Sequence, residues 1–116
     1  MTSSRPKQIL VVDDEPIVRK SVCLALALDG YGLAEASTAE EALSKCDTEI
    51  QVVLTDYRMP GMNGDELAKA IKRRYPSKTV IMLTGFPPDR APEAVNRVLL
   101  KPFEADVLRQ VVAQSL

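Results

Sequence analysis

The stretch that most restricts the possible folds of this chain is residues 52–55, an uncharged run of mostly β-branched side chains that ends on Asp56. Such a run is typical of a strand buried on both faces. The next eight residues contain one proline and two glycines, which indicates a loop. Open α/β sheets bind ligands at the carboxyl ends of their strands. Asp56 is therefore the first candidate for chemistry, although a lone aspartate at such a position more often only begins a turn.

Four other apolar runs alternate along the chain with segments of helical periodicity. We expect strands at residues 9–12, 33–36, 52–56, 79–83 and 98–100. We expect helices from Pro16 to about residue 28, after Ser37, at residues 65–74 and from about Glu104, and Ser37 with Glu40 as a capping box. Strands that alternate with helices predict an α/β fold, here a doubly wound, five-stranded parallel sheet covered on both faces.

The segment between the fourth and fifth expected strands is rich in proline. Residues 86–96 contain three prolines, so at most a short helix fits there, from about Pro92 to Arg97. We therefore expect a shortened or irregular fourth helix.

The composition limits the class of protein. With 116 residues and a net charge of −1, the chain is expected to form a single domain over residues 1–116, with an ordered core from about residue 8. The charge gives no sign of direct nucleic-acid contact, and no apolar run reaches membrane-spanning length. Residues 1–8 lack the hydrophobic region of a signal peptide. Cys23 and Cys46 are expected to be reduced, buried thiols, which favours a cytoplasmic location.

The chain contains no histidine. This excludes Ser-His-Asp and Cys-His catalytic arrangements and every metal site that uses histidine. Any phosphohistidine chemistry in which the protein takes part must use a histidine of a partner.

Polar, chemically active side chains follow four of the five expected strands. They are Asp13 and Asp14, Asp56, Thr84, and Lys101. Each has a structural explanation when taken singly, such as a helix cap for Asp14 or a solvated amine for Lys101. The carboxyl ends of parallel strands meet at one edge of the sheet, so we expect all five side chains to converge there.

Three crowded carboxylates need a cation, because like charges at short range raise one another's pKa. A hard divalent ion with oxygen ligands, Mg²⁺ or Mn²⁺, is the natural partner. A lysine and a threonine beside such an ion supply the positive charge and the hydroxyl donor that a phosphoryl group requires. This chemistry favours phosphoryl acceptance at Asp56, with an aspartyl phosphate as the product.

The ordered set of motifs resembles the receiver domain of two-component response regulators, the CheY-like family, over essentially the whole chain. The motifs are Asp13-Asp14 after a hydrophobic strand, Asp56 followed by Met59-Pro60-Gly61-Met62-Asn63-Gly64, Thr84-Gly85, and Lys101-Pro102-Phe103. The resemblance implies a flavodoxin-like sheet of strand order 2-1-3-4-5. It also implies a regulatory domain that catalyses only its own phosphorylation and dephosphorylation, takes its phosphoryl group from a histidine kinase or histidine phosphotransfer domain, and controls an output domain or target protein.

The resemblance further implies a role for each site residue. Asp56 would accept the phosphoryl group, and Lys101 and Thr84, with the loop at Gly85, would bind its oxygens. Asp14 and Asp56 would hold Mg²⁺ directly, Asp13 through water, and the backbone carbonyl of Arg58 would complete the ion's ligands. The bond before Pro102 would be the family's cis peptide.

The sequence departs from the family pattern near the fifth strand. Val98 occupies a position where most receivers carry Tyr or Phe, so the usual coupling between the threonine and an aromatic ring is in question, unless Tyr57 or Phe86 replaces it. The interval from Thr84 to Lys101 is also short, which predicts a nonstandard output surface. Arg58 and Phe86 could shield an acyl phosphate from water, because each lies two residues beyond a site residue.

Two other functions remain open from the sequence. An aspartate phosphatase of the haloacid dehalogenase type would need a second Asp two residues after the nucleophile, where this chain has Arg58. A non-phosphorylated interaction domain could keep the same fold.

Overall fold

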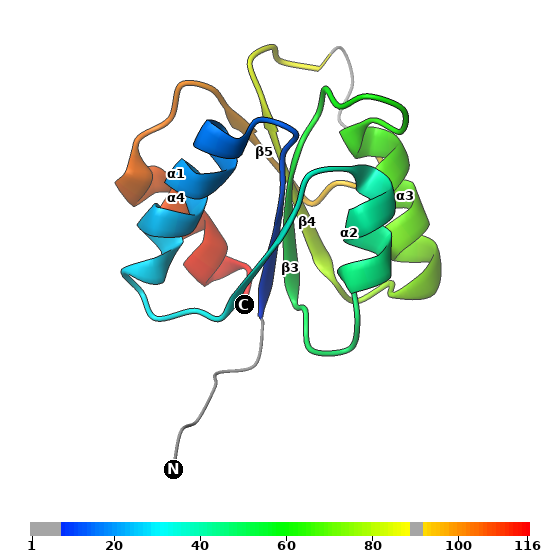
Figure 1. The fold of residues 1–116 in the computed structure, drawn as a ribbon, viewed down its shortest axis with the longest axis horizontal. Coiled ribbons are helices and arrows are strands. Elements are labelled where there is room, and N and C mark those ends of the chain that lie inside the picture. The colour runs from blue at the N-terminus through cyan, green and yellow to red at the C-terminus, as the bar shows by residue number, and fades with distance from the viewer. Residues whose placement is uncertain (1–7, 89–91) are drawn as a thin grey trace.

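The computed structural model describes residues 8–88 and 92–116. Its five strands form one parallel sheet of order β2-β1-β3-β4-β5, with β1 at Ile9–Val12, β2 at Leu33–Ala36, β3 at Val52–Asp56, β4 at Thr79–Thr84 and β5 at Arg97–Leu100. Helices α1 (Pro16–Ala27) and α4 (Ala105–Gln114) lie on one face, and α2 (Ala39–Lys45) and α3 (Gly64–Arg74) lie on the other (Figure 1). The predicted doubly wound α/β fold and its strand order are confirmed.

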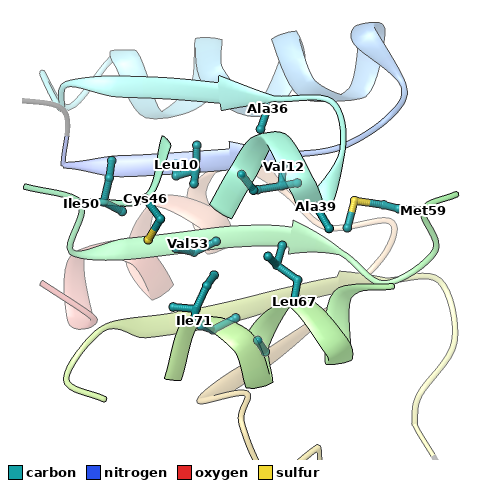
Figure 2. Close-up of a cluster of buried hydrophobic side chains, with 13 residues drawn as sticks. Leu10, Val12, Ala36, Ala39, Cys46, Ile50, Val53, Met59, Leu67 and Ile71 are labelled. Carbon is teal, nitrogen blue, oxygen red and sulfur yellow. The ribbon is translucent and has the colours of Figure 1, made fainter. Parts of the chain in front are cut away.

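The core consists of two layers, because successive side chains of a buried strand point to opposite faces. In β1, Leu10 and Val12 face α2 and α3 (Figure 2), whereas Ile9 and Val11 face α1 and α4. All four are at most 1% exposed. This two-sided burial explains why the strands read as continuous apolar runs, and it holds the strand ends in a fixed relation to one another.

The crossover from β4 to β5 differs most from the prediction. The described residues of this segment form no helix, so the short helix that was the most the prolines would allow, from about Pro92 to Arg97, does not form. A turn replaces it, in which the Val95 N–H donates to the Pro92 carbonyl at 3.2 Å. Asn96 then pairs with Val80 of β4, donating its N–H to the Val80 carbonyl and accepting the Val80 N–H on its side chain, both at 2.9 Å. This pairing starts the β5 ladder early, so Arg97 is the first residue of the strand.

The predicted capping box of α2 is displaced by one residue. Thr38, not Ser37, is the N-cap, and its hydroxyl accepts the Glu41 N–H at 3.0 Å. The Glu41 carboxylate accepts the Ser37 N–H at 2.6 Å, so Glu41 takes the part assigned to Glu40. β2 ends at Ala36 as predicted, Ser37 and Thr38 connect it to α2, and the helix starts one residue later than expected.

The loop between β3 and α3 is held close to the end of β3. Asn63 and Glu66 form a capping box at the start of α3. Gly64 donates its N–H to the Tyr57 carbonyl at 2.8 Å, and a Cβ on Gly64 would lie 2.5 Å from the Asp56 carbonyl oxygen. Only glycine permits this approach, which brings the loop over the carboxyl end of β3.

The end of α4 lies at the opposite edge of the sheet, where the strands begin. The Thr79 hydroxyl, at the first residue of β4, donates to the Ser115 carbonyl at 3.4 Å. β1 also begins at this edge, at Ile9 (Figure 1). The carboxyl edge of the sheet is therefore left to the loops.

Candidate functional site

The carboxyl ends of four strands place polar side chains at one rim of the sheet. Asp13 follows β1, Asp56 ends β3, Thr84 ends β4 and Lys101 follows β5. The Lys101 Nζ atom lies 3.0 Å from Asp56 Oδ1 and 3.8 Å from Asp13 Oδ2. Residues more than 40 positions apart in the sequence thus form ion pairs, as the strand-end pattern predicts.

Three carboxylates crowd this rim. One oxygen from each of Asp13, Asp14 and Asp56 lies within 4.8 Å of the others. Asp13 is only 3% exposed, and its Oδ1 accepts the Glu15 N–H at 2.9 Å. Its Oδ2 atom is buried and accepts no hydrogen bond from the described part of the chain. A buried carboxylate oxygen without a donor, beside two further acids, fits a site for a hard divalent cation with oxygen ligands.

The electrostatics of Asp13 agree with this crowding. Burial raises the pKa of Asp13 above its ordinary value, and the negative charges of Asp56 and Asp14 raise it further. The Glu15 N–H and the Lys101 ammonium act in the opposite direction and stabilise the ionised form. A cation bound among the acids would act in the same direction as Lys101.

Thr84 and Lys101 are tied to each other through the backbone. Thr84 is 6% exposed, and its carbonyl accepts the Lys101 N–H at 2.7 Å. Its hydroxyl oxygen accepts the Phe86 N–H at 3.3 Å. The bond between Lys101 and Pro102 is cis. A hydroxyl, an ammonium and backbone N–H groups therefore stand beside the three carboxylates.

The response regulator receiver domain family matches residues 9–113 of this chain. The chain belongs to this family. Receiver domains of the family are phosphoacceptor signalling switches of two-component systems, and the acidic rim of this chain agrees with that function.

Similar proteins include both regulators and isolated receiver structures. The response regulator protein FleR of Pseudomonas aeruginosa is 35% identical over 92% of the chain, and the transcriptional regulatory protein GlrR of Escherichia coli is 33% identical over 98%. The chain spans about a quarter of the length of these relatives, 24% and 27%. Among solved structures, response regulator TrrA of Thermotoga maritima in complex with Mg²⁺–BeF superposes with a TM-score of 0.86 at 34% identity, covering 95% of this chain and 99% of that one.

The receiver domain has a cation–π contact between two of the loops at the carboxyl ends of the strands. The Arg58 guanidinium carbon lies 5.4 Å from the centroid of the Phe86 ring, which is 68% exposed. The two residues belong to different loops, after β3 and after β4. They also line, with Tyr57 and Thr84, a cavity of about 540 Å³ beside the rim.

The aromatic position discussed above contains no ring in this receiver domain. Val98 lies on β5, paired in register with Met82, and is partly buried. Tyr57 is 38% exposed, and Phe86 lies under Arg58. Neither ring belongs to the buried core clusters of the described residues.

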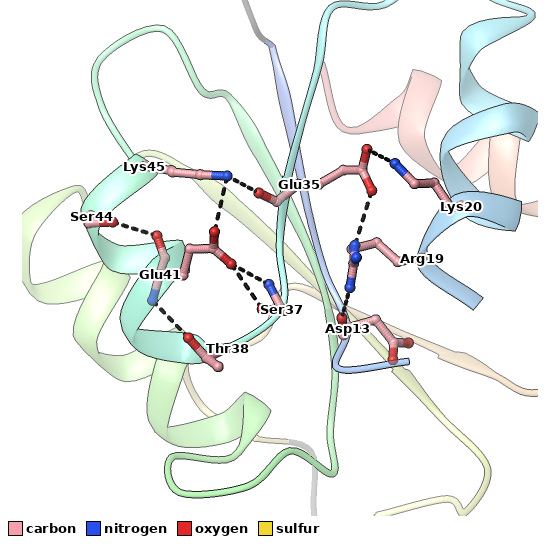
Figure 3. Close-up of polar contacts among 9 residues, drawn as sticks. All are labelled: Asp13, Arg19, Lys20, Glu35, Ser37, Thr38, Glu41, Ser44 and Lys45. Carbon is pink, nitrogen blue, oxygen red and sulfur yellow. Dashed lines mark hydrogen bonds and ion pairs between the residues drawn. The ribbon is translucent and has the colours of Figure 1, made fainter. Parts of the chain in front are cut away.

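Sequence reasoning missed one group that contacts the acidic rim. Arg19 of α1 donates from Nη1 to the Asp13 carbonyl at 2.7 Å and from Nε to Glu35 Oε1 at 3.0 Å (Figure 3). Lys20 donates to the other oxygen of Glu35 at 2.9 Å. The packing of α1 against β1 and β2 brings these residues together, and no local spacing in the sequence signals it. In the described residues, no helix is long and apolar enough to cross a bilayer.

Proposed function

We propose that Asp56 is the phosphoryl acceptor of this receiver domain. The observation that carries the proposal is the position of its carboxylate, 3.0 Å from the Lys101 ammonium and within 4.8 Å of the other two acids. An Asp56 oxygen would attack the phosphorus of a partner's phosphohistidine. The new O–P bond forms as the P–N bond breaks, and the electron pair of that bond returns to the imidazole.

The three carboxylates differ in how far they are available for this step. Asp13 is buried and engaged by the Glu15 N–H, and Asp14 is exposed with no described ion pair to Lys101. Asp56 is partly exposed and contacts the amine that would neutralise an oxygen of the transferred group. Thr84, together with the backbone at Gly85, would donate to a second oxygen.

A divalent cation, Mg²⁺ or Mn²⁺, is part of the proposal. Asp14 and Asp56 would hold it directly, Asp13 through water, and the Arg58 carbonyl would complete the protein's ligands. The buried, donor-free Oδ2 of Asp13 supports a cation at this place, as does the Mg²⁺–BeF complex of the similar TrrA. When bound, the ion would neutralise charge on the phosphoryl oxygens during transfer.

We further infer how the domain is used. The whole of residues 1–116 is one receiver domain with a histidine kinase or histidine phosphotransfer domain as donor, located in the cytoplasm. It makes no direct contact with nucleic acid, and it catalyses only its own phosphorylation and dephosphorylation. Relatives named as transcriptional regulators and as a cyclic di-GMP phosphodiesterase support control of a separate output domain or target.

The output surface is expected to differ from that of other receivers. The crossover lacks a helix among its described residues, and Val98 replaces the usual ring. We propose that the Arg58–Phe86 contact shields the acyl phosphate from water, because the two residues follow Asp56 and Thr84 by two positions and line, with Thr84, the cavity beside the rim.

The test is phosphorylation by a small phosphodonor, acetyl phosphate, with and without Mg²⁺, followed by intact-mass spectrometry. The parent should gain one phosphoryl group in a metal-dependent manner, and Asp56→Asn should gain none. Phosphorylation of Asp56→Asn at the parent's rate would refute the assignment. Failure of the parent to be labelled would favour an interaction domain, and multiple turnover of added phosphate esters would favour a phosphohydrolase.

A further inference from the structure

We propose that Arg19 is a positioning residue for the acidic rim: with Glu35 it holds the backbone of Asp13 and so fixes where the Asp13 carboxylate presents its free oxygen to a divalent cation. This inference rests on the proposed function of the rim as a cation-dependent phosphoryl site. It adds two residues, Arg19 and Glu35, that contact neither the phosphoryl acceptor nor the cation.

Asp13 is held at three points, by β2, by Arg19 of α1 and by Glu15, the N-cap residue of α1. Its N–H donates to the Ala36 carbonyl of β2 at 3.1 Å, its carbonyl accepts Arg19 Nη1 at 2.7 Å, and its Oδ1 accepts the Glu15 N–H at 2.9 Å. Only Oδ2 remains, buried and without a donor, and it faces Lys101 at 3.8 Å. The direction of that last atom therefore depends on the other three contacts.

Arg19 is suited to this task by its shape and by its burial. Its guanidinium is planar, so the contacts of Nε with Glu35 and of Nη1 with the Asp13 carbonyl set the position of one relative to the other. The Arg19 side chain is only 14% exposed, which strengthens its charge-assisted hydrogen bonds. The Asp13 carbonyl lies beyond the end of β1, where the sheet ladder no longer supplies a donor. The Arg19 guanidinium supplies that donor instead.

Glu35 anchors Arg19 to the sheet. It lies on β2 directly opposite Val11 in the parallel ladder, and Val11 is two residues before Asp13. Hydrogen bonds from Lys20 and from Arg19 lower the pKa of Glu35, so it stays ionised at neutral pH. Figure 3 shows the chain of contacts from Lys20 through Glu35 and Arg19 to Asp13.

Lys20 provides a matched control within the same network. It forms an ion pair with Glu35 at 2.9 Å, as Arg19 does at 3.0 Å, and lies one residue further along α1. It makes no described contact with Asp13, and its side chain is 63% exposed. A change at Lys20 removes one charge and one ion pair without touching the backbone of the acidic rim.

The experiment measures Mg²⁺ affinity by isothermal titration calorimetry on the unphosphorylated protein, so that it does not depend on phosphoryl transfer. Arg19→Gln should weaken Mg²⁺ binding about tenfold, as loss of an outer partner of a metal ligand does, and Lys20→Gln by less than a factor of about two. Arg19→Lys keeps the charge but lacks the planar, forked guanidinium that fixes Glu35 and the Asp13 carbonyl relative to each other, so it should resemble Arg19→Gln. Glu35→Gln, which keeps the side chain's shape, should fall between Lys20→Gln and Arg19→Gln.

A second readout separates positioning from a general loss of stability. In metal-free buffer, the ¹³C chemical shift of the Asp13 carbonyl should move in Arg19→Gln and stay in place in Lys20→Gln, while urea unfolding reports the stability of each variant. Equal Mg²⁺ affinity in the parent and Arg19→Gln, or full rescue by Arg19→Lys, would overturn the inference and leave the acceptor role of Asp56 standing. A parent that binds no Mg²⁺ would overturn both.

Discussion

Removing the charge of Asp14 should stabilise this receiver domain when no divalent cation is present. Its carboxylate lies within 4.8 Å of those of Asp13 and Asp56, and no described ion pair offsets the repulsion. At that separation two unit charges repel by about 0.9 kcal/mol in a water-like medium and more where the site is shielded from water. Two such pairs, reduced by salt screening, give about 1 kcal/mol for Asp14→Asn, or about 4 °C in Tm for a domain of this size.

Asp56→Asn should give a smaller gain than Asp14→Asn. Its substitution relieves the same repulsion but also removes the ion pair with Lys101 at 3.0 Å. The two variants therefore separate crowding among the acids from the attraction of the amine. Glu49→Gln, which makes the same change of net charge just before β3 begins, at the opposite edge of the sheet, should leave Tm unchanged.

The assay is thermal unfolding followed by circular dichroism in low salt with a chelator, then with excess Mg²⁺. The ion should stabilise the parent more than either variant, because it binds the folded acidic rim. The pH dependence has a definite sign. Because the pKa of Asp13 is raised in the folded state, the contribution of this group to stability is fully present below the ordinary carboxyl pKa and is lost as the pH rises through the raised value.

The gain from Asp14→Asn should therefore be clear near pH 7 and shrink as the pH falls toward 4. A parent as stable as Asp14→Asn at pH 7 without metal would refute the idea that the three acids are crowded. A gain that persists unchanged at low pH would show that it arises from something other than charge.

Three further predictions concern single contacts. Lys101→Met should slow labelling by acetyl phosphate about 100-fold, measured by mass spectrometry, because it removes the cation beside Asp56, and an unchanged rate would exclude that role. Arg58→Asn and Phe86→Ala should each shorten the lifetime of the phosphorylated protein, followed by loss of label after the donor is removed; lifetimes equal to the parent's would show that their contact shields nothing. Lys78→Met should lower the free energy of unfolding in urea by about 2 kcal/mol, since the buried amine donates to the carbonyls of Asp47 and Ile50; a loss under about 0.5 kcal/mol would contradict this.

The convergence of Asp13, Asp56 and Lys101 could be predicted from the sequence because it follows from topology alone. Once the apolar runs indicate a parallel sheet, every strand end is assigned to the same edge, whatever the side-chain details. The roles of these residues stay predictions until labelling is done. Contacts between α1 and β2, such as that of Arg19 with Glu35, could not be found in this way, because they depend on helix rotation and strand register.

Two local differences from the prediction lie at the boundaries of elements. The spacing predicts Ser37 with Glu40 as the capping box and allows at most a short helix to Arg97, because spacing alone does not determine which residue begins or ends an element. At β5 the sheet took one more residue than the pattern indicated, next to the pairing of Asn96 with Val80. β2 ends at Ala36 as predicted, and only the cap of α2 moved by one residue. The predicted type of an element was correct where its apolar pattern was long. The predicted boundary of an element was wrong where a single hydrogen bond determined it.

The position of the end of α4 has a consequence for how this domain could be joined to others. β1 starts and α4 finishes at the edge where Thr79 meets Ser115, and the acidic rim lies at the other end of strands about 15 Å long. A domain fused after Leu116 would be attached at the edge of the sheet opposite the acidic rim, and would leave the phosphoryl site accessible to the phosphoryl donor. A conformational change caused by phosphorylation would then have to extend along the length of the sheet to affect such a fused domain.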